Sequence, residues 1–141
     1  MWRDLERRAS LYGLPINVPA PYPLKEFDLA NRVAIVGQME GWCAAYARAA
    51  YRRWLVDGKE PGSEPNLSES LVEAGQEPSR VLTLARSDAV ARAFAVATDE
   101  ARKMRIFGAP TFVARGEVFW GDDRLEDAVT WHVHGKLLPV A

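Results

Sequence analysis

The sequence predicts a mostly helical α+β fold, because helical periodicity fills the first hundred residues and a β-hairpin with one helix follows. In several stretches of residues 1–104, apolar side chains recur three or four positions apart, as on one face of a helix. From Thr111 to Trp120, residues typical of β-strands alternate on both sides of Arg115-Gly116, which has the length and the glycine of a two-residue hairpin turn. A hairpin alone is marginal in water and needs further strands beside it.

The composition is that of one globular domain of 141 residues, with 48% apolar and 26% charged residues. Its 18 basic and 19 acidic side chains leave a net charge of -1, so neither nucleic acid nor an acidic membrane surface is expected as a partner. No apolar run approaches the roughly 20 residues that span a bilayer, and the charged start does not resemble a secretory signal. We expect a cytoplasmic protein that binds a small molecule or another protein.

The first half of the chain is predicted to form helices around one extended connector. A short amphipathic helix is expected from Trp2 to Tyr12, and Gly13 closes it. Four prolines within the next part of the chain, "LPINVPAPYP", exclude helix interior and predict an extended connector. The strongest helical signal runs from Ala30 to Val56, where Gly37 and Gly41 predict two helices or a kink.

The second half continues with short helices before the hairpin. A loop is predicted over residues 57–66, then a helix from Leu67 to Ala74, and two more helices in "EPSRVLTLARSD" and "DAVARAFAVATDEARKMRI". After the hairpin, Asp123 and Glu126 have the spacing of a capping box and predict the start of the last helix. That helix is expected to end at Gly135.

Several side chains that could carry chemistry have plainer explanations. The stripe Trp42, Tyr46 and Trp54 is predicted to be chiefly core, with a wall for a hydrophobic substrate pocket as the alternative. Cys43, the one cysteine, is expected to be a small buried filler and not a nucleophile. The run "ARAAYRRW" is expected to be a solvated basic face.

No metal site is predicted. His132 and His134 lie two residues apart near the end of the last predicted helix, a spacing that does not place both imidazoles on one helical face. They are expected to be solvated histidines at a helix end.

Two motifs near the C-terminus carry a family resemblance. "FGAPTF", followed after the hairpin by "FWGDDRLE", resembles the C-terminal ββα half of thioredoxin-like proteins. The resemblance is specifically to the 2-hydroxychromene-2-carboxylate isomerase family and its kappa-class glutathione transferase relatives, which have a DsbA-like fold. Upstream, "RDLERRASLYGLPINVPAPYP" and "LANRVA" are similar to the stretches that lead into the family's helical domain.

The resemblance implies a C-terminal ββα half of a thioredoxin-like fold with an all-helical insert domain. Residues 1–29 would be a helix and connector of the thioredoxin-like part, residues 30–104 the helical insert, and residues 105–141 the ββα half. The family's N-terminal βαβ has no counterpart in this sequence.

The resemblance also implies a glutathione site at Ala109, Pro110, Asp122 and Asp123. A cis Ala109–Pro110 bond would turn the backbone of Ala109 outward to pair with glutathione, while Asp123 would hold the ammonium of its γ-glutamyl end. Asp122 stands where the family often has an uncharged residue, and its charge would weaken capture of the ligand's carboxylate. From the residues alone, Pro110 could equally be a trans strand-initiating proline and Asp123 only a helix cap.

The implied activity is glutathione-dependent cis–trans isomerisation of a small aromatic substrate in aromatic catabolism. The family's thiol-activating serine belongs to the βαβ, so no catalytic residue is assigned, and we expect a truncated chain that is inactive alone. Two alternatives stay open. One is a DsbA-like thiol-disulfide oxidoreductase; the other is a non-enzymatic helical binding or assembly module, including a homodimer, whose exposed hairpin edge pairs with another chain.

Overall fold

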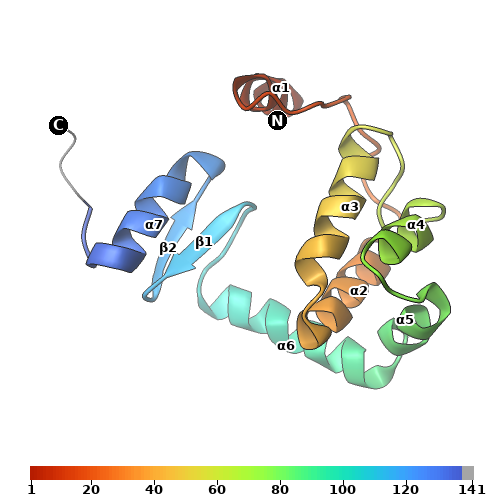
Figure 1. The fold of residues 1–141 in the computed structure, drawn as a ribbon. Coiled ribbons are helices and arrows are strands. Elements are labelled where there is room, and N and C mark those ends of the chain that lie inside the picture. The colour runs from red at the N-terminus through yellow and green to blue at the C-terminus, as the bar shows by residue number, and fades with distance from the viewer. Residues whose placement is uncertain (138–141) are drawn as a thin grey trace. The chain divides into compact units, whose positions relative to one another are not determined.

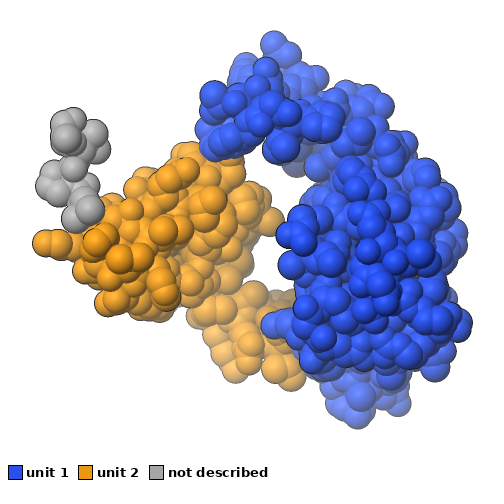
Figure 2. Space-filling model, viewed as in Figure 1, with its two compact units in different colours: residues 1–94 blue, residues 95–141 orange. Residues whose placement is uncertain are grey.

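The computed structural model describes residues 1–137, and the chain divides into two compact units, Met1–Phe94 and Ala95–Ala141 (Figure 2). Helices make up unit 1 and continue into the start of unit 2 (Figure 1): α1 Trp2–Leu11, α2 Phe27–Glu40, α3 Cys43–Leu55, α4 Asn66–Glu73, α5 Pro78–Ala85 and α6 Asp88–Lys103. The remainder of unit 2 contains β1 Thr111–Ala114, β2 Glu117–Trp120, a 3-10 turn Asp122–Arg124, and α7 Leu125–His134.

The predicted fold class is confirmed, since the fold is mostly helical with one small antiparallel sheet. The long helical signal from Ala30 to Val56 is divided between α2 and α3. Gly41 ends α2 in the left-handed conformation at φ 86°, which glycine adopts without steric cost. Gly37 lies inside α2, where a Cβ would come within 2.9 Å of the Trp42 ring. One glycine therefore ends the helix, and the other makes room for the packing of α3.

The proline-rich connector is not helical, as its prolines predicted, and is fastened to α3. The backbone N–H of Asn17 donates to the carbonyl of Leu55 at 2.6 Å. The indole Nε1 of Trp54 donates to the carbonyl of Pro21 at 2.8 Å. These bonds give the connector a defined path along α3 and hold the Trp54 side chain in one orientation.

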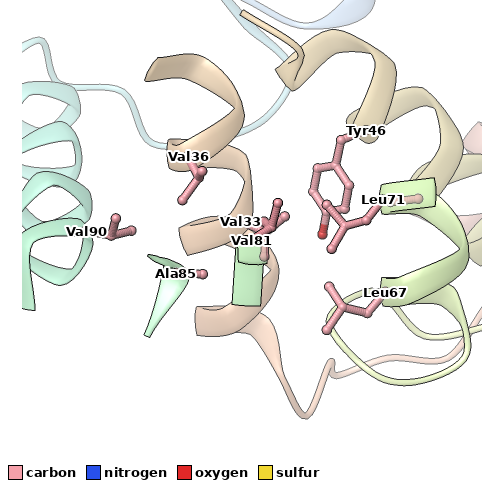
Figure 3. Packing of buried hydrophobic residues seen from close by; sticks show 9 residues of the cluster. Val33, Val36, Tyr46, Leu67, Leu71, Val81, Ala85 and Val90 are labelled. Carbon is pink, nitrogen blue, oxygen red and sulfur yellow. The ribbon is translucent and has the colours of Figure 1, made fainter. Parts of the chain in front are cut away.

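The core of unit 1 lies where α2, α3, α4 and α5 meet, with one residue added by α6 (Figure 3). Each fully buried aliphatic side chain contributes roughly 1.5–3 kcal/mol to stability. The buried members of this core are Val33, Val36, Tyr46, Ala50, Leu67, Leu71, Val81, Ala85 and Val90.

A polar pair is buried in the same region. Asn66 and Ser70 are both 0% exposed. The Asn66 amide donates to the carbonyl of Ala50 at 3.1 Å and to that of Lys59 at 2.7 Å. Its Oδ1 accepts from the Ser70 hydroxyl at 2.7 Å. This pair, which hydrophobic periodicity does not reveal, ties α3 to α4 and to the loop between them.

The expectation of a solvated basic face on α3 is wrong, because α4 brings carboxylates against it. The Arg52 guanidinium donates to both carboxylate oxygens of Glu73, at 3.0 and 2.6 Å. Arg53, whose side chain is only 12% exposed, pairs with Glu69 and with Glu73. Hydrogen bonds from Lys59 and Arg53 lower the pKa of Glu69, and those from Arg52 and Arg53 lower the pKa of Glu73. The basic run is an ion-pair network between two helices.

Replacing Tyr46 by phenylalanine is expected to raise the free energy of unfolding by about 1 kcal/mol, since an unsatisfied buried polar group costs roughly 1–3 kcal/mol. Tyr46 is 3% exposed, and its hydroxyl, which points toward Leu71 in Figure 3, has no hydrogen-bond partner among residues 1–137. Burial raises the pKa of this phenol. Urea titrations of the wild type and of Tyr46→Phe measure the difference. The exposed Tyr51→Phe is the control, and a loss of stability in Tyr46→Phe would contradict the expectation.

The predicted hairpin is confirmed in unit 2. Arg115 and Gly116 form its turn at φ 51° and 84°. Helix α7 packs on the hairpin, with the rings of Phe119 and Trp131 6.3 Å apart. The Arg115 guanidinium donates to the backbone carbonyl of His132 at 2.7 Å. The turn residue therefore provides a hydrogen-bond donor to a carbonyl in the last turn of α7. The cross-strand pairs are Thr111 with Trp120, Phe112 with Phe119, Val113 with Val118, and Ala114 with Glu117.

Candidate functional site

The loop before β1 presents backbone groups to solvent. The Ala109–Pro110 bond is cis, as predicted, and both residues are exposed. Within residues 1–137, neither the N–H nor the C=O of Ala109 is hydrogen-bonded. Gly108 is held beneath Trp120, since a Cβ there would come within 2.5 Å of the indole nitrogen, and its carbonyl accepts from the Thr111 hydroxyl. Gly108 and Thr111 therefore hold the loop on either side of Ala109, whose backbone N–H and C=O are unpaired among the described residues.

A backbone hydrogen bond joins this loop to the turn after β2. The N–H of Gly121 donates to the carbonyl of Pro110 at 3.0 Å. Asp122 and Asp123 follow Gly121 directly. The structure therefore brings the four residues of the expected glutathione site into one neighbourhood of unit 2.

Asp123 is not the N-cap of the last helix, so the capping-box prediction is wrong. Helix α7 begins at Leu125 with Arg124 in the N-cap position, and no side chain caps it. The 3-10 turn Asp122–Arg124 intervenes and moves Asp123 out of capping position. Gly121 has φ 116° and ψ 150°, a conformation essentially limited to glycine, and a Cβ there would collide with the Asp123 carboxylate.

Of the charged side chains in this turn, the Asp123 carboxylate is the one that faces solvent without the nearby arginine as a partner. The guanidinium of Arg124 donates to the carboxylate of Asp127 at 2.6 Å, so it is already committed to a partner on α7. Asp122 is half-buried, and Asp123 is exposed. An exposed carboxylate in a turn that is hydrogen-bonded to a loop with unpaired backbone groups suits a ligand that carries an ammonium group and a peptide backbone.

Two exposed aromatic rings flank the loop. Phe107 is 75% exposed and Trp120 is 54% exposed, and their ring centroids lie 4.9 Å apart. Sequence reasoning did not single out this pair. The signal was available, because one ring precedes Gly108 and the other closes β2 directly before Gly121. The pair provides an apolar surface next to the loop.

The cysteine and the two histidines considered in the sequence lie at the start of α3 and at the end of α7. Cys43 is half-buried at the start of α3, and burial raises the pKa of its thiol, which disfavours the nucleophilic thiolate. His132 and His134 are exposed in the last turn of α7. Residues 1–137 contain no cluster of three or more metal-ligating side chains. None of the helices in this range has the length and apolar character needed to cross a membrane.

A family profile described as "DSBA-like thioredoxin domain" matches residues 1–130, which include α1 to α6, the hairpin, the loop and turn described above, and the first part of α7. This chain belongs to the DsbA-like thioredoxin domain family. The match confirms the predicted resemblance, which included the helical part as well as the C-terminal motifs. The domain boundaries predicted at residues 29 and 104 stay predictions, as does the binding role of each site residue.

Proteins that are similar to this chain are named isomerases. The 2-hydroxychromene-2-carboxylate isomerase of Sphingobium xenophagum is 29% identical over 126 residues, which cover 89% of this chain and 63% of that protein. The protein of the same name from Pseudomonas putida is 28% identical, with 86% and 59% covered. A solved structure of selenomethionine 2-hydroxychromene-2-carboxylate isomerase matches with a TM-score of 0.77 at 28% identity, covering 90% of this chain and 61% of that one. The chain spans about 60% of the length of these relatives.

Proposed function

We propose that this chain forms the helical and ββα parts of a glutathione-dependent 2-hydroxychromene-2-carboxylate isomerase. The observation that carries the proposal is the loop–turn pair at Ala109 and Gly121, in a chain similar over 86–90% of its length to proteins of that name. Glutathione would supply a thiolate that adds to a conjugated double bond, allows rotation, and leaves again.

The loop and turn fit the two ends of this tripeptide. The unpaired N–H and C=O of Ala109 can pair with its backbone as a strand added to a sheet edge. The Asp123 carboxylate can accept from its γ-glutamyl ammonium in a charge-assisted hydrogen bond. The charge of Asp122 opposes the ligand's own carboxylate, so we expect modest affinity.

We further propose that thiolate formation needs a donor beyond the loop and turn. Asp122 and Asp123 carry negative charge, which disfavours a second negative charge nearby. Ala109 and Pro110 offer no side-chain donor. The single cysteine, Cys43, whose pKa is raised, is poorly suited to the oxidoreductase alternative. The 141 residues alone are therefore expected to bind glutathione weakly and to lack isomerase turnover.

Changing Asp123 to alanine is expected to weaken glutathione binding by about 10- to 150-fold, the range for losing one hydrogen bond to a charged group. Titration calorimetry of the 141-residue chain measures the change. Glu126→Ala removes an exposed carboxylate of α7 and should alter the affinity by less than about twofold. Equal effects of the two substitutions would refute the role of Asp123.

The isomerase activity is tested with a chimera. The N-terminal part of the Pseudomonas putida isomerase, where the family resemblance implies a βαβ, is joined to residue 1, and the absorbance of 2-hydroxychromene-2-carboxylate is followed with and without glutathione. We expect turnover that requires glutathione and falls in Asp123→Ala. A folded chimera that binds glutathione without isomerising this substrate would show that the site is right and the reaction wrong.

A further inference from the structure

An apolar pocket of about 130 Å³ lies between α2 and α3, with the connector and the loop after α3 at its sides. Most of its lining comes from two rows of residues with the same helical spacing, 27, 30, 31 and 34 on α2 and 47, 50, 51 and 54 on α3. On each helix, small alanine side chains leave the space and aromatic rings from the same helix stand around it. The main wall residues are Phe27, Ala30 and Ala34 on α2, and Ala47, Tyr51 and Trp54 on α3.

The aromatic wall on α3 is held in place before any ligand arrives. The indole of Trp54 is fixed by its hydrogen bond to the carbonyl of Pro21, and the ring of Tyr51 lies 5.8 Å from it. Phe27 and Tyr51 are 56% and 57% exposed, so these rings remain accessible. A preformed pocket with accessible aromatic walls is typical of small-molecule sites.

The lining of the pocket disfavours a charged ligand. Every residue that lines the pocket is uncharged. Asn31 and Tyr51 are lining residues with polar side-chain groups, whereas the Tyr46 hydroxyl is buried in the core and the Trp54 indole nitrogen already donates to a backbone carbonyl. The Asn31 amide is held by its hydrogen bond to the backbone carbonyl of Phe27 at 2.8 Å. An ionised ligand would lose hydration without gaining a counter-ion. A single polar substituent could still be accommodated.

We propose that this pocket binds one neutral, planar aromatic ring. An apolar cavity of about 150 Å³ binds benzene, so a pocket of about 130 Å³ has the size for roughly one ring, whose substituent would have to extend toward solvent. Flat rings also gain edge or offset stacking against aromatic walls, which a saturated ring of the same size does not. The site lies within residues 24–61 and does not depend on the glutathione proposal.

The test uses benzyl alcohol as the neutral aromatic probe, benzoate as its charged counterpart, and cyclohexylmethanol as its saturated counterpart. Binding to the 141-residue chain is followed by NMR of ¹³C-labelled alanine methyl groups. We expect saturable shifts at Ala30, Ala34 and Ala47 with benzyl alcohol, and affinities at least about tenfold lower for the other two probes. Equal affinity for benzoate, or no shift at these methyls, would overturn the proposal.

Filling the pocket provides a matched pair of variants on α3. Ala47→Leu places a larger side chain in the pocket, whereas Ala44→Leu makes the same change at an exposed position. We expect about tenfold or greater loss of benzyl alcohol binding in the first and less than about twofold change in the second. If Ala47→Leu does not fold, Tyr51→Ala, which removes a wall, must show the loss. Unchanged binding in the folded variants would overturn the proposal.

Discussion

Replacing Asn66 by aspartate is expected to lower the free energy of unfolding of unit 1 by about 3 kcal/mol or more. The change is nearly isosteric, so it leaves the packing intact. It replaces an amide that donates to the carbonyls of Ala50 and Lys59 by a carboxylate that repels both. The site is 0% exposed, so water cannot compensate. The fold would keep its hydrophobic core and lose the polar link between α3 and α4.

Urea unfolding followed by tryptophan fluorescence measures this loss. Asn17→Asp makes the same change at an exposed position, where we expect a shift of less than about 0.5 kcal/mol. Burial raises the pKa of the introduced carboxyl in the folded state, so part of the lost stability should return as the pH falls and the group is protonated. Equal stability of the two variants near neutral pH would show that the polar pair contributes little.

Replacing Gly121 by alanine is expected to disrupt the turn before α7 and to weaken glutathione binding by about tenfold or more. The backbone conformation at this residue is essentially limited to glycine, and a side chain in such a conformation costs of order 1–3 kcal/mol. The added methyl group would also displace the Asp123 carboxylate. The hydrogen bond to Pro110 that joins loop and turn would be lost with it.

Amide hydrogen exchange at residue 121 reports the structural part of this change, and calorimetry with glutathione reports the binding part. Gly116→Ala is the control, because it also has positive φ but no atom lies within 4 Å of its added Cβ. We expect the control to lose only the roughly 1–2 kcal/mol of a left-handed residue and to keep the turn at 121. Slow exchange at residue 121 in both variants would contradict the expectation. Lost protection with unchanged binding would separate the turn from the glutathione site.

Much of the fold follows from local chemistry that the sequence shows. The helices over residues 2–103 carry apolar side chains at helical spacing, and proline excludes the connector from helix. Gly41 and Gly135 end helices in the left-handed conformation, as expected from their positions. Arg115-Gly116 forms the hairpin turn. These outcomes depend on backbone preferences within a few residues, so neighbouring side chains suffice to determine them.

The tertiary structure decided what lies opposite each side chain. The sequence predicts a solvated Arg53, but in the structure α4 places Glu69 and Glu73 against it. The sequence likewise predicts Asn66 to be a loop residue, but α3 and α4 bury it. Asp123 has the spacing of a helix cap, yet the 3-10 turn directs its carboxylate over Gly121. The carboxylate partners of Arg53 and the carbonyls that accept from the Asn66 amide are 7 to 20 residues away in sequence. Hydrogen bonds and ion pairs form at contact distance, and which groups reach that distance depends on how the elements pack.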